Sequence, residues 1–530
     1  MYLREVSVKR KDGRVVTYLR LVHSYRDPVK GYPVQKVIHS FGKVTEVNRK
    51  ELTSIATSIL NYMNQSDARV IKGDSTFPWG KSYGTVHLVR ELADKLKITS
   101  VIRSQLKRRN FESPIAMAIL AMVINRLMEP SSKHAMVMSD WLEEDIYLPD
   151  SEGIRLHHLY RGLDFLEECK EELEEELFWQ SRNLFNRKLD MVFYDTTSTY
   201  VEGEGEDDLC QYGYSRDHRS DRKQVVIGLA TDKDGMPITS SVFPGNTMDM
   251  ITVETMLKHL EKFDIKSCLF VCDRGMVSEE NLDKLEQAGY GYLVGVKLRQ
   301  LKEVRDQVLP VRGRYHKVAD NLKVKEVRLQ GKRYVICLNE REAKRDREIR
   351  ETILNALPAE LEAVNSGKSP CTILNHAIKK RLVRQLTTGR LVLNKGAIQR
   401  ESRYDGKYVL RTSNMGLSSG ELAQQYKNLF RVERAFRTLK SGLDLRPIYH
   451  RVEHRIKAHV SLCILAYTIA RHAEVKTGIT WERISQISRR LQAIKISLKN
   501  GEIIRTSNVS DKLQQIVNKL DIKTPPEILV

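Results

Sequence analysis

Residues 189–200 have the sequence LDMVFYDTTSTY. The run Leu189–Tyr194 is apolar enough to predict a buried β-strand, and an acid, Asp195, follows it directly. A second short apolar run, Leu269–Cys272, ends in the same way at Asp273. The ends of strands in one sheet are rigid and aligned, so two aspartates placed there can point into one crevice. Each aspartate taken alone is better explained as a turn residue, and only the pair indicates a site.

The chain around the two aspartates is predicted to alternate between strands and helices. Asp234-Gly235 is a strong signal for a tight hairpin turn between two strands. The predicted elements are strands at Gln224–Ala230 and Ile238–Phe243, a helix at 248–262, a helix at 279–288 and a strand at Tyr290–Val296. Together with the two strands that precede the aspartates, this order predicts a mixed sheet in an α/β layer.

A third acid lies on a long amphipathic helix predicted at residues 419–441. Six residues at alternating steps of four and three fall on one face of that helix, namely Leu422, Tyr426, Leu429, Glu433, Phe436 and Lys440. Because this face is largely apolar, we expect Glu433 to point inward. An unpaired buried carboxylate is costly, and metal ions or a nearby cation would remove that cost. Taken alone, Glu433 is as easily structural as catalytic.

Three converging carboxylates suit the chemistry of phosphodiester cleavage. Hard divalent cations prefer carboxylate oxygens as ligands. Two Mg²⁺ ions about 3.5–4 Å apart can activate a water or a 3′-hydroxyl and stabilise the leaving oxygen. Lys440 lies two helical turns beyond Glu433, where its ammonium can contact a phosphate near the metals.

Composition indicates a polyanionic partner. The 530 residues include 88 Lys and Arg against 68 Asp and Glu, a formal net charge of +20. Charge alone does not separate nucleic acid from an anionic membrane. The apolar runs Ile115–Ile124 and Val460–Ala470 are shorter than the about 20 residues that a membrane-spanning helix needs, so we expect no membrane. Seven cysteines without a CxxC pattern fit a reducing compartment such as the cytoplasm.

Changes in sequence pattern divide the chain into six predicted regions. The segment Gly73–Gly80 is predicted to be a linker, and Asp12-Gly13 a hairpin turn. The helical region carries the basic cluster Lys107-Arg108-Arg109, which fits a DNA-binding bundle and a solvated structural bundle equally well. The regions are a small β region at 1–72, a helical, probable DNA-binding region at 73–187, an α/β part at 188–300, a β-rich insertion at 301–415, the glutamate helix part at 416–476 and a basic helical region at 477–530.

The acids and their surroundings resemble a known family. Tyr194-Asp195-Thr196-Thr197, Cys272-Asp273-Arg274-Gly275 and the helix with Tyr426, Glu433 and Lys440 together resemble the DDE transposases of prokaryotic insertion sequences. More narrowly, they resemble the group with a Y–R–E–K signature around the glutamate. The similarity covers most of the chain, and the segments Gly213–Arg219 and Pro244-Gly245-Asn246 belong to it.

This resemblance implies a fold, a cofactor and roles for the acids. The fold is an RNase H-like catalytic core interrupted by a β-rich insertion before the glutamate helix. The cofactor is Mg²⁺, as two ions held by Asp195, Asp273 and Glu433, with Mn²⁺ as a substitute. The resemblance also implies that Tyr426 and Lys440 contact DNA phosphates near the cleavage point.

The signature arginine is replaced in this chain. It should lie three residues after the tyrosine, where the sequence has Leu429. Arg431 is close but falls on a different helix face, so we expect Arg434 or Arg437 to reach the DNA backbone instead. The basic loop Ser215–Lys223 supplies two further candidate phosphate contacts, Arg216 and Arg219. The alternative for this loop is an exposed charged segment without a ligand.

A competing motif indicates a different enzyme class. Residues 450–454, His-Arg-Val-Glu-His, match the H-x-x-E-H pattern of one metalloprotease class. That pattern needs both histidines on one helix, and Pro447 lies just before it. The basic surroundings also suit phosphate better than Zn²⁺, so we rank this hypothesis second among the enzymes.

We therefore expect a transposase of a mobile element, active in DNA recombination in the prokaryotic cytoplasm at the nucleoid. Its partners would be double-stranded DNA, as terminal inverted repeats and target DNA, and a second copy of the chain in a homodimer that pairs two element ends. Two alternatives stay open. An RNase H-like nuclease would cut without joining strands, and an inactive DNA-binding protein would show no Mg²⁺-dependent cutting.

Overall fold

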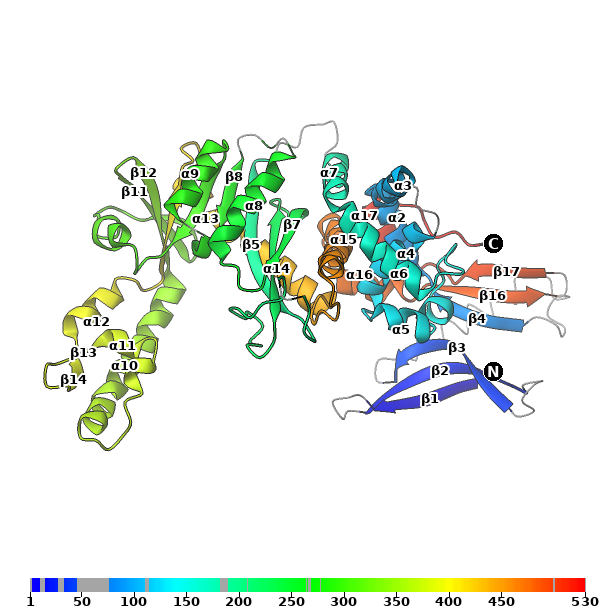
Figure 1. Ribbon diagram of the computed structural model, residues 1–530, viewed down its shortest axis with the longest axis horizontal. Helices are drawn as coiled ribbons and strands as arrows, with labels where there is room; N and C mark the ends of the chain where they lie inside the picture. Colours follow the sequence, from blue (N-terminus) through cyan, green and yellow to red (C-terminus); the bar gives the residue numbers. More distant parts are fainter. Residues whose placement is uncertain are drawn as a thin grey trace.

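The computed structural model describes residues 2–9, 15–26, 33–44, 76–109, 114–181, 189–206, 208–263, 265, 268–276, 278–498 and 501–529. Figure 1 shows an elongated arrangement, with a large sheet and its helices toward one end and a helical region toward the other. A three-stranded sheet that contains the N-terminus lies beside the helical region. The predicted hairpin turn at Asp12-Gly13 lies outside the described residues.

The large sheet has nine strands in the order β10-β11-β12-β15-β9-β8-β5-β6-β7. Five of them form its catalytic half: β5 (Met191–Tyr200), β6 (Gln224–Thr231), β7 (Pro237–Pro244), β8 (Leu269–Cys272) and β9 (Gly291–Val296). β5 pairs antiparallel with β6 and parallel with β8, and β8 pairs parallel with β9. The first strand thus lies at the centre, with an antiparallel hairpin on one side and parallel strands on the other. This is the mixed, RNase H-like arrangement that the sequence predicts.

Both faces of this half-sheet are buried, which explains why its strands are continuously apolar. Successive side chains point to opposite faces, so Phe193 and Tyr194 enter different cores. Tyr194 and Phe270 pack with α8 (Asp249–Glu261) and α9 (Glu279–Gln287). Phe193 belongs to the core that contains α14 (Phe430–Arg437) and α15 (Glu453–Thr477). The glutamate helix therefore lies on the opposite face from α8.

The strands of the predicted insertion extend the same sheet. β15 (Lys407–Thr412) pairs antiparallel with β9, and β12 (Lys332–Asn339), β11 (Leu322–Leu329) and β10 (His316–Ala319) follow outward. The chain between β12 and β15 leaves the sheet and forms a small module with its own apolar cluster (Figure 1). Its elements are α10 (Glu340–Asn365), α11 (Lys379–Leu382), β13 (Val383–Gln385), β14 (Leu391–Leu393) and α12 (Lys395–Ser402).

The helical region combines segments from both ends of the chain. Its N-terminal helices are α2 (Gly84–Lys95), α3 (Ile98–Arg108), α4 (Ile115–Met128), α5 (Lys133–Met138), α6 (Leu156–Glu168) and α7 (Lys170–Ser181). They share one core with α15, α16 (Trp481–Ser488) and α17 (Asp511–Leu520). Because α15 follows directly on the glutamate helix segment, this shared core ties the catalytic half-sheet to the helical region.

Two predictions about the flanking segments were wrong. The predicted linker Gly73–Gly80 supplies a strand, β4 (Thr76–Ser82), which pairs with β16 (Gln492–Leu498). The C-terminal region, predicted to be helical, contains the hairpin of β16 and β17 (Gly501–Thr506). β4 has its partner more than 400 residues away, and a pattern within one segment gives no sign of such pairing. The N-terminal sheet itself is the antiparallel series β1 (Tyr2–Lys9), β2 (Val15–Arg26) and β3 (Pro33–Lys43).

Candidate active site

Asp195 and Asp273 lie side by side where the parallel pairing of β5 and β8 stops. The last paired residues are Tyr194 and Cys272, and an aspartate follows each of them. The prediction that Asp195 ends its strand was wrong, because β5 continues to Tyr200 against β6. β8 does end at Cys272, so the sheet opens between the two strands just where both carboxylates begin. The two aspartates therefore occupy neighbouring positions in the sheet, one just after a strand end and one within a strand.

The charges of the other two predicted acids affect the pKa of Asp195. Its pKa is raised to about 7, chiefly by burial and in smaller part by the charges of Asp273 and Glu433. The backbone N–H of Thr196, 2.8 Å from Oδ1, and the positive charge of Arg216 act in the opposite direction and lower this pKa. The three acids that were proposed from strand ends and helix periodicity thus lie close enough to interact electrostatically.

Tyr426 holds Asp273 in place. Its hydroxyl donates a hydrogen bond to Oδ1 of Asp273 at 3.1 Å. The ring lies across Gly295 of β9, where a Cβ would collide with the tyrosine hydroxyl, so glycine leaves the room for this contact. Burial and the nearby Asp273 raise the pKa of Tyr426, which keeps the hydroxyl protonated and able to donate. In the DNA-free chain, the hydroxyl of Tyr426, predicted to contact a phosphate, therefore contacts a candidate metal ligand.

The predicted helix at 419–441 is broken, and its phase changes at the break. α13 (Ser419–Lys427) ends, α14 restarts at Phe430, and a π-helical turn, η5 (Thr438–Gly442), follows. Val432, Ala435, Phe436 and Leu439 are buried, whereas Glu433 is exposed. The prediction that Glu433 is buried on one continuous apolar face was wrong. Glu433 is instead exposed to solvent, yet close enough for its charge to raise the pKa of Asp195.

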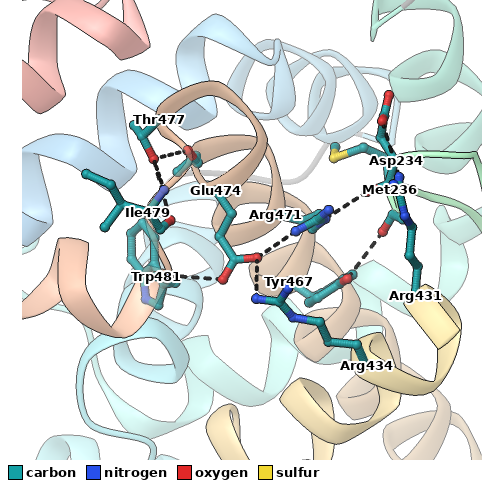
Figure 2. A network of polar contacts seen from close by, with 12 residues as sticks. Asp234, Met236, Arg431, Arg434, Tyr467, Arg471, Glu474, Thr477, Ile479 and Trp481 are labelled. Carbon is teal, nitrogen blue, oxygen red and sulfur yellow. Dashed lines mark hydrogen bonds and ion pairs between the residues drawn. The ribbon is translucent and has the colours of Figure 1, made fainter. Parts of the chain in front are cut away.

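Polar contacts fix α14 against its neighbours (Figure 2). Arg431 donates to the carbonyl of Lys233 and lies 3.4 Å from Asp234, so it reaches the turn between β6 and β7. On the other side, Arg434 lies 3.8 Å from Glu474 of α15.

Glu474 is the centre of this network. One of its oxygens accepts from the guanidinium of Arg471 at 2.8 Å, and the other accepts from the backbone N–H of Trp481 at 3.1 Å. Arg471 also donates to the carbonyl of Asp234, and Tyr467 donates to the carbonyl of Gly235 (Figure 2). The helix that carries Glu433 is therefore coupled to both the hairpin turn and α15. Arg437 is exposed on the same helix.

Lys440 is almost buried, at 10% side-chain exposure. Its ammonium donates to the carbonyl of Ser198 on β5 at 2.6 Å and to Asp217 Oδ1 at 2.8 Å. Arg446 donates to the same Asp217 oxygen at 2.5 Å. Asp217 lies in the basic loop, and the sequence analysis did not single it out. Both of its cationic partners are more than 200 residues away along the chain, so no local pattern could have identified it.

Arg216 is also engaged within the site. Its guanidinium donates to both oxygens of Asp249, at 2.8 and 2.9 Å, and to Thr196 Oγ1 at 3.2 Å. Asp249 begins α8 and is a fourth acid that the sequence analysis missed. An acid in the first turn of a helix is common, so the sequence gave no distinctive signal for it. Arg219 forms an ion pair with Asp221 and lies over the Tyr200 ring at 4.9 Å.

The H-x-x-E-H segment does not have the geometry of a zinc motif. α15 begins at Glu453, so His450 lies before the helix and His454 within it. His454 lies 3.2 Å from Asp164, and burial lowers the pKa of His450 to about 3. Across the residues that the structure describes, no three His, Cys, Asp or Glu side chains are gathered closely enough to hold a metal ion. None of the helices in the described part of the chain is long and apolar enough to cross a membrane.

Comparisons with known proteins identify the family of the chain. Among solved structures, the chain resembles the piggyBac transposase synaptic complex with hairpin DNA, at 8% identity, covering 82% of this chain and 78% of that one with a TM-score of 0.37. A search of curated proteins finds no match. The family model of the IS1634 family transposase N-terminal domain matches residues 3–70. The family model of the transposase DDE domain matches residues 187–469, more than half of the chain. The chain therefore belongs to the DDE transposases of prokaryotic insertion sequences.

Proposed function

We propose that Asp195, Asp273 and Glu433 are the carboxylates with which this insertion-sequence transposase cuts and joins DNA. The observation that carries the proposal is the pKa of Asp195, which is raised by burial and then by the fields of the other two acids. A partly buried carboxylate beside two more negative charges is unfavourable without a cation. The proposal thus rests on a charge imbalance that a divalent ion would remove.

The chemistry of the three donors suits a hard divalent cation, since they are carboxylate oxygens from two neighbouring strands and one helix. Among the described residues the three are not gathered closely enough to hold a metal ion as they stand, so binding would have to draw Glu433 toward the two aspartates. DDE transposases generally use divalent metal ions, and we assign Mg²⁺, as two ions with Mn²⁺ as a substitute, to these three acids. When bound, such ions activate the attacking oxygen and stabilise the leaving one. Tyr426 holds the Asp273 carboxylate in one orientation, and the Thr196 N–H does the same for Asp195.

The remaining candidate residues would bind the DNA backbone. Lys440 follows Glu433 by seven residues, and its ammonium contacts β5 at the carbonyl of Ser198. We assign it to the phosphate at the cleavage point. Arg437 is exposed and available to a neighbouring phosphate. Arg434, Arg216 and Arg219 pair with carboxylates in the DNA-free chain, so DNA would have to compete with those acids.

The reaction would proceed in two in-line displacements. Water first attacks the phosphodiester at the element end and frees a 3′-hydroxyl, and this hydroxyl then attacks target DNA. The substrates are the terminal inverted repeats and the target duplex. Two ends must be brought together for joining, so we propose a homodimer in which each copy binds one end. We place the enzyme in the prokaryotic cytoplasm, at the nucleoid.

Cleavage of a duplex that carries the terminal repeat tests this proposal. With Mg²⁺, the wild type should nick at the repeat boundary, and Glu433→Gln should bind the same duplex without cutting it. Glu482→Gln, which removes an exposed glutamate on α16, is the matched control and should cut normally. Products joined to target DNA distinguish a transposase from a nuclease. If wild type and Glu433→Gln both bound and neither cut, the catalytic assignment would be wrong.

A further inference from the structure

The basic loop Ser215–Lys223 is connected through an acid to the segment that follows Glu433. Asp217 is the most deeply buried carboxylate there, with 3% of its side chain exposed. Its Oδ1 accepts from both Lys440 and Arg446, while its Oδ2 is buried without a hydrogen-bond partner. The preceding residue, Arg216, donates its backbone N–H to Ser198 Oγ at 2.9 Å. Asp217 thus connects the loop to the segment after the glutamate helix.

The geometry of Lys440 leaves it one free donor. An ammonium has three N–H groups, and two are used by the Ser198 carbonyl and Asp217. Asp217 carries one negative charge against the two positive charges of Lys440 and Arg446. The cluster therefore has one surplus positive charge, which a single phosphate would neutralise. The cluster contacts β5 at Ser198, three residues or roughly 10 Å of strand from Asp195, so the phosphate would lie on the same strand as that acid.

We propose that Asp217 is a positioning residue of the transposition reaction, which keeps the Lys440 ammonium in place and directed at the phosphate to be cleaved. This inference rests on the assignment of Lys440 to that phosphate. Asp217 itself touches neither DNA nor metal and acts through the lysine.

Electrostatics explain why the lysine needs this partner. Burial lowers the pKa of Lys440, and Asp217 raises it again, while Arg446 and Arg216 lower it. Without the aspartate, the ammonium would face two arginines in a nearly buried setting. It would then lose its proton at a lower pH or swing toward solvent. Removing one partner of a buried ion pair leaves the other charge uncompensated. Without Asp217, the charge of Lys440 would therefore have no neighbouring anion among the described residues.

A double-mutant cycle for the Mg²⁺-dependent nicking rate separates action through Lys440 from other effects. The four proteins are wild type, Asp217→Asn, Lys440→Ala and the double variant. Asp217→Asn should cut at least 10-fold more slowly than wild type. The double variant should cut less than 2-fold more slowly than Lys440→Ala alone. Repeat binding without Mg²⁺ should stay within 2-fold. Asp208→Asn removes an exposed aspartate close to the loop and should cut as wild type does.

The pH profile gives a readout that a purely structural role would not move. In Asp217→Asn, the alkaline limb of the nicking rate should begin at a lower pH than in wild type, because Lys440 deprotonates earlier. The inference would be overturned if Asp217→Asn slowed nicking by the same factor in the wild-type and the Lys440→Ala background. It would also be overturned if the alkaline limb of Asp217→Asn began at the same pH as in wild type.

A folding control and a second variant keep the test decisive. If thermal melting shows that Asp217→Asn is unfolded, Arg446→Gln replaces it, since this change keeps the Asp217–Lys440 pair and removes a competing cation. Its alkaline limb should stay in place or move to higher pH, and a shift to lower pH would contradict the inference. Failure of the proposed function looks different, because wild type itself would then not cut the repeat.

Discussion

Replacing Asp195 by asparagine should make the metal-free protein more stable while abolishing its activity. In the folded chain the pKa of Asp195 is raised from 3.8 to about 7, chiefly by burial. Below pH 3.8 the carboxyl is protonated in both the folded and unfolded states, so its ionisation does not lower the free energy of unfolding. Between pH 3.8 and about 7 the folded state holds the proton more tightly, and stability falls as pH rises. Above about pH 7 the cost is complete.

The size of this cost follows from the same two pKa values. The difference between 3.8 and about 7, at 1.36 kcal/mol per pH unit, corresponds to about 4 kcal/mol at pH 8. Asparagine keeps the shape of the side chain and removes the charge, so Asp195→Asn should recover much of that amount. In a domain of 150–250 residues, 1 kcal/mol moves Tm by roughly 2–4 °C. A rise of several degrees at pH 8 is therefore expected.

Thermal melting in EDTA at pH 8 and at pH 5 measures the effect. Asp195→Asn should melt well above wild type at pH 8, and the gap should shrink at pH 5. Mg²⁺ should then stabilise wild type more than the variant. Asp190→Asn, at an exposed position just before the same strand, is the control and should melt as wild type does. A variant that melts with or below wild type at pH 8, or a gap that does not depend on pH, would refute the electrostatic reasoning.

Three further predictions concern the support of the site and its affinity for DNA. Glu474→Gln should weaken the network that holds Arg434 and slow nicking by roughly 10-fold, with a loss of about 1–3 kcal/mol of stability measured by melting; unchanged nicking would contradict the role of this network. Gly295→Ala should push the Tyr426 hydroxyl away from Asp273 and lower the nicking rate while repeat binding is kept, as a gel-shift assay beside the cleavage assay would show. Repeat binding should weaken steeply with salt, with log K falling by about 0.9 per phosphate contact against log salt concentration, and a flat dependence would argue against phosphate contacts.

The parts of the fold that depend on local pattern could be predicted from the sequence. The strands before Asp195 and Asp273 and the hairpin at Asp234-Gly235 were predicted from apolar runs and turn residues, and the structure confirms them. The position of Asp195 within its strand could not be predicted, because β5 is prolonged by its pairing with β6. Strand ends depend on the partner strand, and the partner is not visible in a single run of residues.

The helix around Glu433 shows that the spacing of apolar residues does not reveal where a helix breaks. A regular spacing from 419 to 441 predicted one helix, but the chain breaks between Lys427 and Phe430 without a glycine or proline to mark it. After the break, Val432 and Ala435 take the buried face of α14 and Glu433 is exposed. The convergence of Glu433 with the other acids stays a prediction, whereas its predicted inward orientation was wrong because the side chain is exposed. Tertiary packing decided the phase of the helix.

The charges of the site divide into two parts that need different partners. On one side, Asp195, Asp273 and Glu433 share a region where their negative charges raise the pKa of the most buried member, and Arg216 is already committed to Asp249. On the other side, Lys440 and Arg446 exceed the single charge of Asp217. The first part is relieved by cations and the second by an anion. Strand β5 carries both parts, since Asp195 and the Ser198 carbonyl that accepts from Lys440 are three residues apart, and the proposed function places the phosphate and the cations along this one strand. The sequence sets the charges of each part. The fold places the acidic part, which needs cations, and the basic part, which needs an anion, on the same strand.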